Sequence, residues 1–400
     1  MGIKKLAREE RGSVAVMFAV ALVPLLGLTG AAVDYVRATQ SRSKMQAAAD
    51  SAALAAVLAQ VPTTAQREGT AQQVFSSVRP AGVRAVPTIS ATTTQATVTA
   101  TGQVETSLLK VVRVPQIAIR SHAVAVKSFD GPPPCVLALN KTVDKALLIT
   151  GSAQYVAQGC VLHSNSASAQ SLVVDNNTAV QAGGFCAVGK ATIPSGVTPL
   201  ARSYCAPLED PFRNLQSPPV GACIATNLEV APHQTAVLKP GTYCGGLTIK
   251  GTATLNAGIY VISGLFSITS QATVKGSGVM FYLTGTTAGF NIQAGAVIDL
   301  SAPTSGQYGG ILFFQDRLAN PGFTNLFAGG SDTKLMGSIY TPTQKVRVAG
   351  GSGVSQDIPF LPIIADQVEI TGNIKAKAVL AGTTLPFPLP KTESGARLVE

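Results

Sequence analysis

The chain has 400 residues, of which 46% are hydrophobic and only 12% charged, with a formal net charge of +10 and a mean hydropathy of +0.30. This composition excludes an acidic disordered chain and argues against an ordinary soluble enzyme, and the length predicts two or more folded units. The 39 glycines, 24 prolines and absent tryptophan, together with abundant Val, Ile and Thr, favour many short strands separated by turns.

The excess of positive charge lies towards the N-terminus. Residues 1–134 contain 14 Lys and Arg against 7 Asp and Glu, whereas residues 135–400 contain 16 against 13. Four of the cations, Lys4, Lys5, Arg8 and Arg11, directly precede an apolar run. That order is typical of a membrane-topology signal, and no later basic cluster is interleaved with aromatic residues, so we expect no nucleic-acid partner.

Residues 12–33 contain no charged side chain. About 20 helical residues cover the roughly 30 Å hydrocarbon layer of a bilayer. We therefore predict a cytoplasmic basic leader over residues 1–12, a transmembrane helix over residues 13–33, and an extracytoplasmic location for the rest. Arg37, Arg42 and Lys44 count against this orientation because they place positive charge on the other flank.

The helix is expected to continue beyond the membrane to about Val61, because residues 45–59 contain eight alanines and neither Gly nor Pro. Its face of Ala47, Ser51, Leu54, Leu58 and Val61 packs either on its own domain or on a helix of a larger assembly. A second helix is expected from Thr63 to Val78, and alternating β-branched residues predict strands over 86–92, 95–101 and 117–126. Residues 34–128 thus form an α+β unit, a long helix on a small antiparallel sheet. Residues 129–134, with three consecutive prolines, are expected to be a stiff linker.

This order of features resembles the N-terminal region of the TadE/TadG family of tight-adherence (Flp) pilus assembly proteins. The resemblance covers about residues 1–126, and rests on residues 44–56, residues 98–126 and the positions Gly12, Pro24, Asp34, Arg37, Ala49, Asp50 and Ala53. It implies a pilin-like stalk and partners among pilus assembly or pilin-like proteins. Asp34, Arg37 and Asp50 are candidate assembly contacts, although Asp34 and Asp50 have an equally simple interpretation as polar residues on an exposed helix.

Family members that are cleaved by prepilin peptidase have a glycine followed by an apolar segment with Glu at its fifth residue. Met17 occupies that position after Gly12. The departure from the pattern implies that the Gly12/Ser13 junction stays uncleaved, and it favours the TadG-like branch, which keeps its N-terminal segment as an anchor.

A repeat is visible between residues 235 and 285, with an offset of 19 or 20 residues. It aligns residues 246–249 with 265–268, 253–255 with 272–274, and 258–261 with 278–281. A period near 20 with short strands predicts a right-handed parallel β-solenoid over residues 135–385, followed by a tail over 386–400. A β-sandwich is the alternative. Short segments from Gly337, Val346 and Val368 also resemble β-helix domains of bacterial pilus-related surface proteins.

All six cysteines follow the linker, at spacings of 25, 26, 19, 18 and 21 residues and without a CxxC pair. An even number in an oxidising compartment predicts disulfides rather than a zinc site, and it supports the extracytoplasmic placement of this part of the chain. Six cysteines can pair in many ways, of which we favour the sequential pairing Cys135–Cys160, Cys186–Cys205 and Cys223–Cys244.

Motifs for catalysis, metals or cofactors are absent from the sequence. The three histidines, His122, His163 and His233, stand outside any HExxH motif, and no GxxxxGK[ST] phosphate loop occurs. We expect no metal and no cofactor. A β-solenoid does allow one enzymatic alternative, a glycan-active enzyme, for which the candidate side chains are Asp316, Arg317, Lys345, Arg347 and Asp366; scattered solvated charges are the simpler interpretation.

Together these features predict a non-enzymatic, single-pass inner-membrane component of a tight-adherence pilus system. Its N-terminus would lie in the cytoplasm and its solenoid in the periplasm or at the cell surface, where it would bind envelope components or a host surface.

Overall fold

The computed structural model describes residues 11–329, 333–350, 359–372, 375–378 and 389–399. The chain divides into two compact units, and it passes between them twice. Unit 1 comprises residues 1–128 and 395–400, and unit 2 comprises residues 129–394.

Unit 1 is built on α1 (Arg11–Leu58), a continuous helix of 48 residues that contains Pro24. Residues 16–22 and 24–29 are exposed, whereas one face of its second half is buried, with Met45, Ala48, Ala49, Ala52, Ala53 and Ala56 at helical spacing. Because alanine has a short side chain, this face allows a sheet to approach the helix backbone closely. Of the face that the sequence suggested as a packing surface, Leu54 packs against the core of unit 1, whereas Ala47 and Leu58 point outward, Leu58 being 46% exposed.

The helix ends at Leu58, three residues earlier than expected, and a buried arginine satisfies its last carbonyl groups. Arg67 belongs to α2 (Thr64–Val78) and is 1% exposed. Its Nη1 donates hydrogen bonds to the carbonyls of Ala56, Val57 and Ala59, the last at 2.8 Å. The guanidinium therefore replaces the intrahelical donors that the end of α1 lacks.

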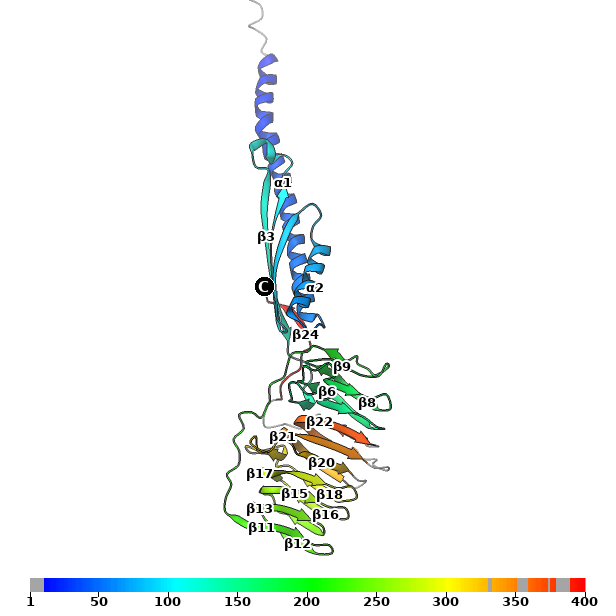
Figure 1. The fold of residues 1–400 in the computed structure, drawn as a ribbon. Coiled ribbons are helices and arrows are strands. Elements are labelled where there is room, and N and C mark those ends of the chain that lie inside the picture. The colour runs from blue at the N-terminus through cyan, green and yellow to red at the C-terminus, as the bar shows by residue number, and fades with distance from the viewer. Residues whose placement is uncertain (1–10, 330–332, 351–358, 373–374, 379–388, 400) are drawn as a thin grey trace, which may run out of the picture. The chain divides into compact units, whose positions relative to one another are not determined.

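The sheet of unit 1 is antiparallel and four-stranded, in the order β1 (Arg84–Ala91), β2 (Gln95–Glu105), β3 (Gln116–Ser128) and β24 (Gly395–Leu398). Between β2 and β3 lies a short 3₁₀ turn, η1 (Leu109–Val112). Figure 1 shows β3 lying along α1. The segment that the sequence analysis treated as a tail thus supplies an edge strand, in which Gly395 pairs with Ser128.

Unit 2 is a parallel β-solenoid, in which each strand pairs with the equivalent strand of the next coil (Figure 1). In chain order its strands are β4 (Pro134–Ala138), β5 (Leu147–Ile149), β6 (Gln154–Ser164), β7 (Leu172–Val174), β8 (Ala179–Ala187), β9 (Ala191–Thr192), β10 (Arg202–Ser203), β11 (Cys223–Val230), β12 (Thr235–Leu238), β13 (Gly241–Ile249), β14 (Thr252–Leu255), β15 (Gly258–Ile268), β16 (Thr273–Ser277), β17 (Val279–Ile292), β18 (Val297–Ser301), β19 (Ile311–Gln315), β20 (Thr324–Gly329), β21 (Thr333–Gly350), β22 (Pro359–Gly372) and β23 (Lys375–Ala378). The β-sandwich alternative is therefore wrong.

The register of the coils matches one part of the predicted repeat and differs from the others. Leu247 pairs with Phe266, an offset of 19 residues, as the repeat predicted. Ala253, however, pairs with Val274 instead of Ala272, and Tyr260 pairs with Phe281 instead of Met280. The coil lengthens at the turn after Ile268, where Gln271 adopts a left-handed backbone conformation. A fixed offset cannot follow such an insertion.

The coils do not stack in chain order. The first coils, from β4 to β10, stack on β22 and β23 near the end of the unit, because β22 pairs with β21 on one side and with β4 and β5 on the other. The chain then runs to the opposite end of the solenoid and builds back from β11 to β22 (Figure 1). A single segment between β10 and β11 must therefore span the stacked coils.

Aromatic residues fill the interior of the central coils. Phe281 stacks with Phe266 and Phe313 at centroid distances of 4.5 and 5.2 Å, and Phe290 stacks with Phe313 at 4.7 Å. Offset aromatic pairs at this spacing add about 0.5–1.5 kcal/mol each beyond the area they bury. This interior accounts for the high apolar fraction and the low charge of the sequence.

Candidate functional site

The exposed N-terminal part of α1 is the candidate anchor. Within Val16–Leu58 an 18-residue window reaches a mean hydropathy of 2.3, and 6% of that window is buried. This is the only helix among the described residues that is long and apolar enough to cross a membrane. Lys4, Lys5 and Arg8 of the basic leader lie outside the described residues, and Arg11 begins the helix.

The junction that processing would cut lies inside this helix. Gly12 and Ser13 belong to the first turn of α1, and Met17 is 66% exposed. The expectation that the junction stays uncleaved remains a prediction.

Asp34, directly after the apolar run, is bound within unit 1. The residue is 2% exposed, and its carboxylate accepts hydrogen bonds of 2.8–2.9 Å from the backbone amides of Ser107, Leu108 and Leu109. The N–H groups of Leu109 and Ser107 hold the pKa of Asp34 below its usual value. Asp34 therefore fixes the β2–β3 connection to the helix, a role that the sequence analysis did not identify.

The other two candidate assembly contacts have different surroundings. Arg37 is exposed, and its Nη1 donates to the Oγ of Ser107 at 2.8 Å. Asp50 is half-buried and accepts a hydrogen bond from the side chain of Gln46, which also bonds the carbonyl of His122 on β3. Asp34 and Arg37 thus meet at Ser107 of the β2–β3 connection, whereas Asp50 lies farther along α1, beside β3.

Comparison with known protein families gives a match to the helix that carries these residues. Residues 12–66 match the family model of Flp pilus-assembly TadE/G-like proteins (Tad). The chain carries a TadE/G-like segment. The match begins at the second residue of α1 and ends in the first turn of α2, so it covers the candidate anchor, Asp34, Arg37 and Asp50 but neither the sheet nor unit 2. No curated protein and no solved structure gave a significant match.

Outside the TadE/G-like segment, the most distinctive element is the segment between β10 and β11. We call residues 206–222 the strap. Leu208 and Phe212 of the strap are buried against a row of apolar side chains on the outer face of successive coils, Leu137, Val261, Met280, Tyr282, Ile311, Phe314, Tyr340 and Ile364. The strap thus connects the two ends of the solenoid and covers this row.

Hydrogen bonds and an aromatic contact hold the first half of the strap on the coils. The backbone N–H and carbonyl of Leu208 bond the side-chain amide of Asn165 at 2.9 and 2.7 Å. The ring of Phe212 meets Tyr340 edge-on at 5.0 Å, and the Tyr340 hydroxyl donates to Asp210 at 2.7 Å.

Two of the three disulfides close the strap at its two ends. The structure contains Cys135–Cys160, Cys186–Cys205 and Cys223–Cys244, the same pairs that the sequence analysis favoured. Cys205 directly precedes the strap and is bound to β8, whereas Cys223 directly follows it and is bound to β13. Cys135–Cys160 ties β4 to β6.

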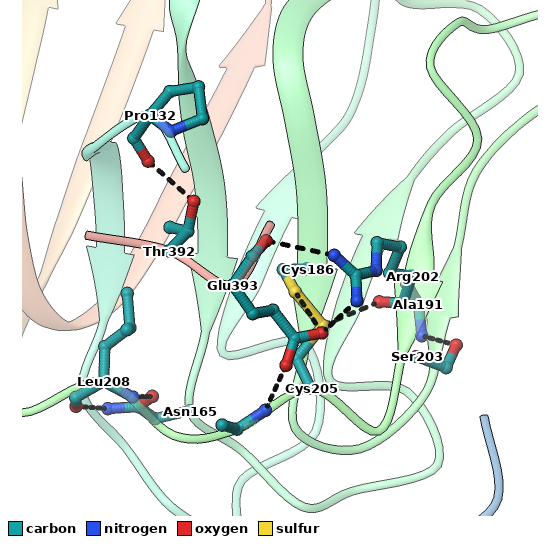
Figure 2. The surroundings of a disulfide bond; sticks show 11 residues. Pro132, Asn165, Cys186, Ala191, Arg202, Ser203, Cys205, Leu208, Thr392 and Glu393 are labelled. Atoms are coloured by element: carbon teal, nitrogen blue, oxygen red, sulfur yellow. Dashed lines mark hydrogen bonds and ion pairs between the residues drawn. A yellow bond between two sulfur atoms is a disulfide. The ribbon is translucent and has the colours of Figure 1, made fainter. Parts of the chain in front are cut away.

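The Cys186–Cys205 bond lies beside the returning C-terminal segment, as Figure 2 shows. Glu393 is buried there, with Oε1 at 2.6 Å from Nη2 of Arg202 and Oε2 accepting from the amide of Ala206 at 3.2 Å. The same segment bonds the expected linker, since Thr392 accepts from the amide of Gly131 and donates to the carbonyl of Pro132. Although Cys186, Cys205 and Glu393 lie close together, both sulfurs are in the disulfide and leave no thiolate to bind a metal.

His163 lies in the same region and is 1% exposed, and neither of its ring nitrogens is placed to form a hydrogen bond with another residue of the described ranges. It continues the outer row, because it pairs with Leu137 on one side and with Cys186 on the other. Burial lowers the pKa of His163 to about 4, and the Glu393 carboxylate opposes this effect only in part. The imidazole is therefore neutral at neutral pH. His122, by contrast, is exposed on β3 and shares a hydrogen bond with Thr99.

A groove next to the strap is the main candidate for ligand binding on unit 2. Its volume is about 660 Å³. Apolar residues such as Leu139 and Val188 line it together with four charged ones, Lys141, Glu209, Asp210 and Arg213. Cavities of this size are typical of binding sites for small molecules.

The candidate catalytic side chains lie outside this groove, and each is bonded to its neighbours. Arg317 lies over the rings of Phe314 and Tyr340 and donates to the carbonyl of Phe212. Lys345 and Arg347 share Glu369. Asp316 accepts from Thr284, and Asp366 accepts from Asn140. These contacts attach the strap and connect neighbouring coils.

Proposed function

We propose that this protein is a non-enzymatic, single-pass component of a tight-adherence (Flp) pilus assembly system. Its N-terminus would lie in the cytoplasm, α1 would cross the inner membrane, and unit 2 would present a binding surface outside the cytoplasm. The observation that carries the proposal is that the TadE/G-like match coincides with the apolar helix, because the family relation and the physical anchor then fall on the same residues.

The orientation is supported from both sides of the membrane segment. Lys4, Lys5, Arg8 and Arg11 precede the apolar run, which favours a cytoplasmic N-terminus. The three disulfides of unit 2 require an oxidising compartment, such as the periplasm or the cell surface.

Contact with other pilus assembly or pilin-like proteins is assigned to α1. Its buried alanine face is occupied by the sheet of unit 1, whereas the face that includes Ala47 and Leu58 points outward. Small residues on an outward face allow a second helix to approach closely. Arg37, which is exposed, adds a charge to the same stretch.

A binding role for unit 2 is supported by the groove beside the strap, which is lined by apolar residues and by charged residues of both signs. The bonding of Asp316, Arg317 and Lys345 to structural partners favours this role over the glycan-active alternative, because catalytic groups need access to substrate. The ligand would be an envelope component or a molecule of a host surface.

A deletion of unit 2 tests whether unit 1 carries the membrane anchor and the partner contacts while unit 2 carries the binding surface. Ser128 and Gly395 are antiparallel partners on β3 and β24, so residues 129–394 can be replaced by Asn-Gly, which closes a two-residue hairpin and keeps unit 1 complete. We expect this variant to insert in the membrane and to crosslink to the same pilus partners as the full chain, while surface attachment of the cells is lost.

Two results would contradict the proposal. Attachment that survives the deletion would remove the binding role of unit 2. Cleavage of a polysaccharide by the purified protein, abolished by Asp316→Ala, would show an enzyme instead.

A further inference from the structure

Several apolar side chains of the connection between β2 and β3 are exposed and are not packed into the core of unit 1. We call residues 107–114 the tip. Val111 is 84% exposed and Val112 is 62% exposed, and Leu108 and Val114 are exposed as well, at 50% and 42%. Two cations, Lys110 and Arg113, lie between these side chains. A cluster of exposed apolar residues with interspersed cations is typical of segments that lie in a membrane interface.

The tip has a fixed position against α1. Asp34 binds the amides of Ser107, Leu108 and Leu109, and Arg37 bonds the side chain of Ser107. A methyl group added to Gly30 would come within 2.8 Å of the Leu108 side chain, so the glycine allows the tip to lie directly on the helix. Thr106 also closes the base of the tip through hydrogen bonds to Val114 and Pro115.

This position places the tip at the level where the apolar run of α1 ends. Gly30 lies inside the uncharged segment 12–33 and Asp34 lies just outside it, which is a rise of about 6 Å along the helix. The helix surface at this level is also apolar and exposed, with Leu28 at 71% and Tyr35 at 67%. Tyrosine is common at the boundary between lipid and water. The apolar surface of the tip therefore continues that of the membrane helix.

We propose that the tip inserts into the extracytoplasmic face of the bilayer that α1 crosses, with Val111 and Val112 among the upper acyl chains and Lys110 and Arg113 at the phosphate groups of anionic lipids. The inference rests on the proposed membrane anchor and adds a second point of contact to it. A lipid surface is favoured over a protein partner because the tip is held against the span itself, and because its cations flank the apolar side chains in the way that interfacial segments use to reach the headgroups. Two contacts with the bilayer, through α1 and through the tip, would fix the tilt of unit 1 relative to the membrane.

The absence of tryptophan from the sequence allows a direct test with one introduced fluorophore. The full chain is reconstituted in vesicles of phosphatidylcholine and phosphatidylglycerol, either as Val111→Trp or as the control Val86→Trp, whose site on β1 is 73% exposed. We expect Val111→Trp to emit at shorter wavelength and to be quenched at least twofold more strongly by lipids brominated on the upper acyl chain. Val86→Trp should be quenched mainly by aqueous iodide. Val112→Trp provides a second probe in case the first variant does not fold.

The contribution of Lys110 and Arg113 to the contact with anionic lipids is tested in the same assay. In vesicles of phosphatidylcholine alone the lipid quenching of Val111→Trp should fall, and addition of Lys110→Gln and Arg113→Gln should remove the difference between the two vesicle types. The matched changes Arg84→Gln and Arg120→Gln, at exposed sites on β1 and β3, should leave that difference intact.

Three other outcomes would overturn the inference. Quenching of both tip probes by iodide alone would place the tip in water and overturn the inference while the anchor stands. Shielding from both quenchers would show that a protein, such as a second copy of this chain, covers the tip, which also overturns it. Failure of the chain to float with the vesicles would overturn the anchor and the inference together.

Discussion

Oε1 of Glu393 lies 2.6 Å from Nη2 of Arg202, although 191 residues separate them in the chain. Arg202 ends the first group of coils, and Glu393 belongs to the segment that returns to unit 1. This pair, beside the Cys186–Cys205 bond, holds the returning segment on the solenoid.

We expect Glu393→Ala to lower the free energy of unfolding of unit 2 by about 2 kcal/mol, because it leaves the guanidinium of Arg202 and the amide of Ala206 without their charged acceptor. Chemical denaturation of the full chain measures this change. Glu209→Ala is the matched control, because Glu209 forms an ion pair with Arg213 in which both side chains are exposed; it should cost less than about 0.5 kcal/mol. Equal effects of the two changes would show that the Arg202–Glu393 pair does not hold the returning segment on the solenoid.

His163 predicts a specific dependence of stability on pH. Its pKa in the folded chain is about 4, below the ordinary value of 6.5, so the unfolded chain binds the additional proton between these two values. Stability should therefore be fully present above about pH 6.5 and should fall by about 3 kcal/mol as the pH decreases to about 4. His163→Leu, which repeats the neighbouring Leu137, should flatten this part of the profile. A slope that is unchanged in the variant would show that other groups cause it.

The disulfides at the ends of the strap should contribute more than local stability. Each native bridge typically adds about 2–4 kcal/mol by restricting the unfolded chain. We expect Cys186→Ser with Cys205→Ser, or Cys223→Ser with Cys244→Ser, to free one end of the strap and expose the apolar row that includes Met280 and Phe314. Binding of a hydrophobic dye to the native variants measures this exposure. Cys135→Ser with Cys160→Ser, which leaves both strap ends closed, is the control and should destabilise the chain with little dye binding.

Peptide mapping without reduction checks the pairing itself. Any pair other than the three in the structure would contradict this arrangement of the strap.

Phe212 should be the main apolar contact of the strap. Phe212→Ala removes a ring that is 1% exposed and packs on Tyr340, so it should cost about 3–5 kcal/mol. Leu318→Ala, at a site that is 93% exposed, should change stability by less than about 0.5 kcal/mol. Thermal unfolding of the two variants separates these outcomes, and a mild effect of Phe212→Ala would mean that the strap packs loosely.

Much of this architecture can be predicted from local patterns. The uncharged run 12–33, the alanine-rich stretch after it and the alternation of β2 and β3 each depend on side chains that are close in sequence. The repeat likewise predicts the solenoid, because its offset of 19 or 20 residues corresponds to about one coil. It does not predict which coil stacks on which, since most coils offer similar apolar rows. The pairing of β22 with β4, and the register shift of Tyr260, therefore appear only in the structure.

The same distinction between local patterns and contacts distant in sequence applies to the site residues. The cysteine pairing was within reach because neighbouring cysteines are about one coil apart. Glu393, Asp34 and the tip were missed or assigned another role, because their partners lie 73 or more residues away and no local motif marks them. The alternation of Leu and Val with Lys110 and Arg113 at the end of a hairpin was the one available signal for the tip.

The central claim is that the TadE/G-like segment anchors the chain with unit 2 outside the cytoplasm, and topology tests it most directly. The full chain is fused at its C-terminus to a reporter enzyme that is active only outside the cytoplasm or, in a parallel fusion, to one that is active only inside it. We expect activity from the first fusion and none from the second. Replacement of Lys4, Lys5, Arg8 and Arg11 by Gln should reduce that preference. Activity of the cytoplasmic reporter in the unmodified chain would reverse the orientation, place the six cysteines in a reducing compartment and contradict the account.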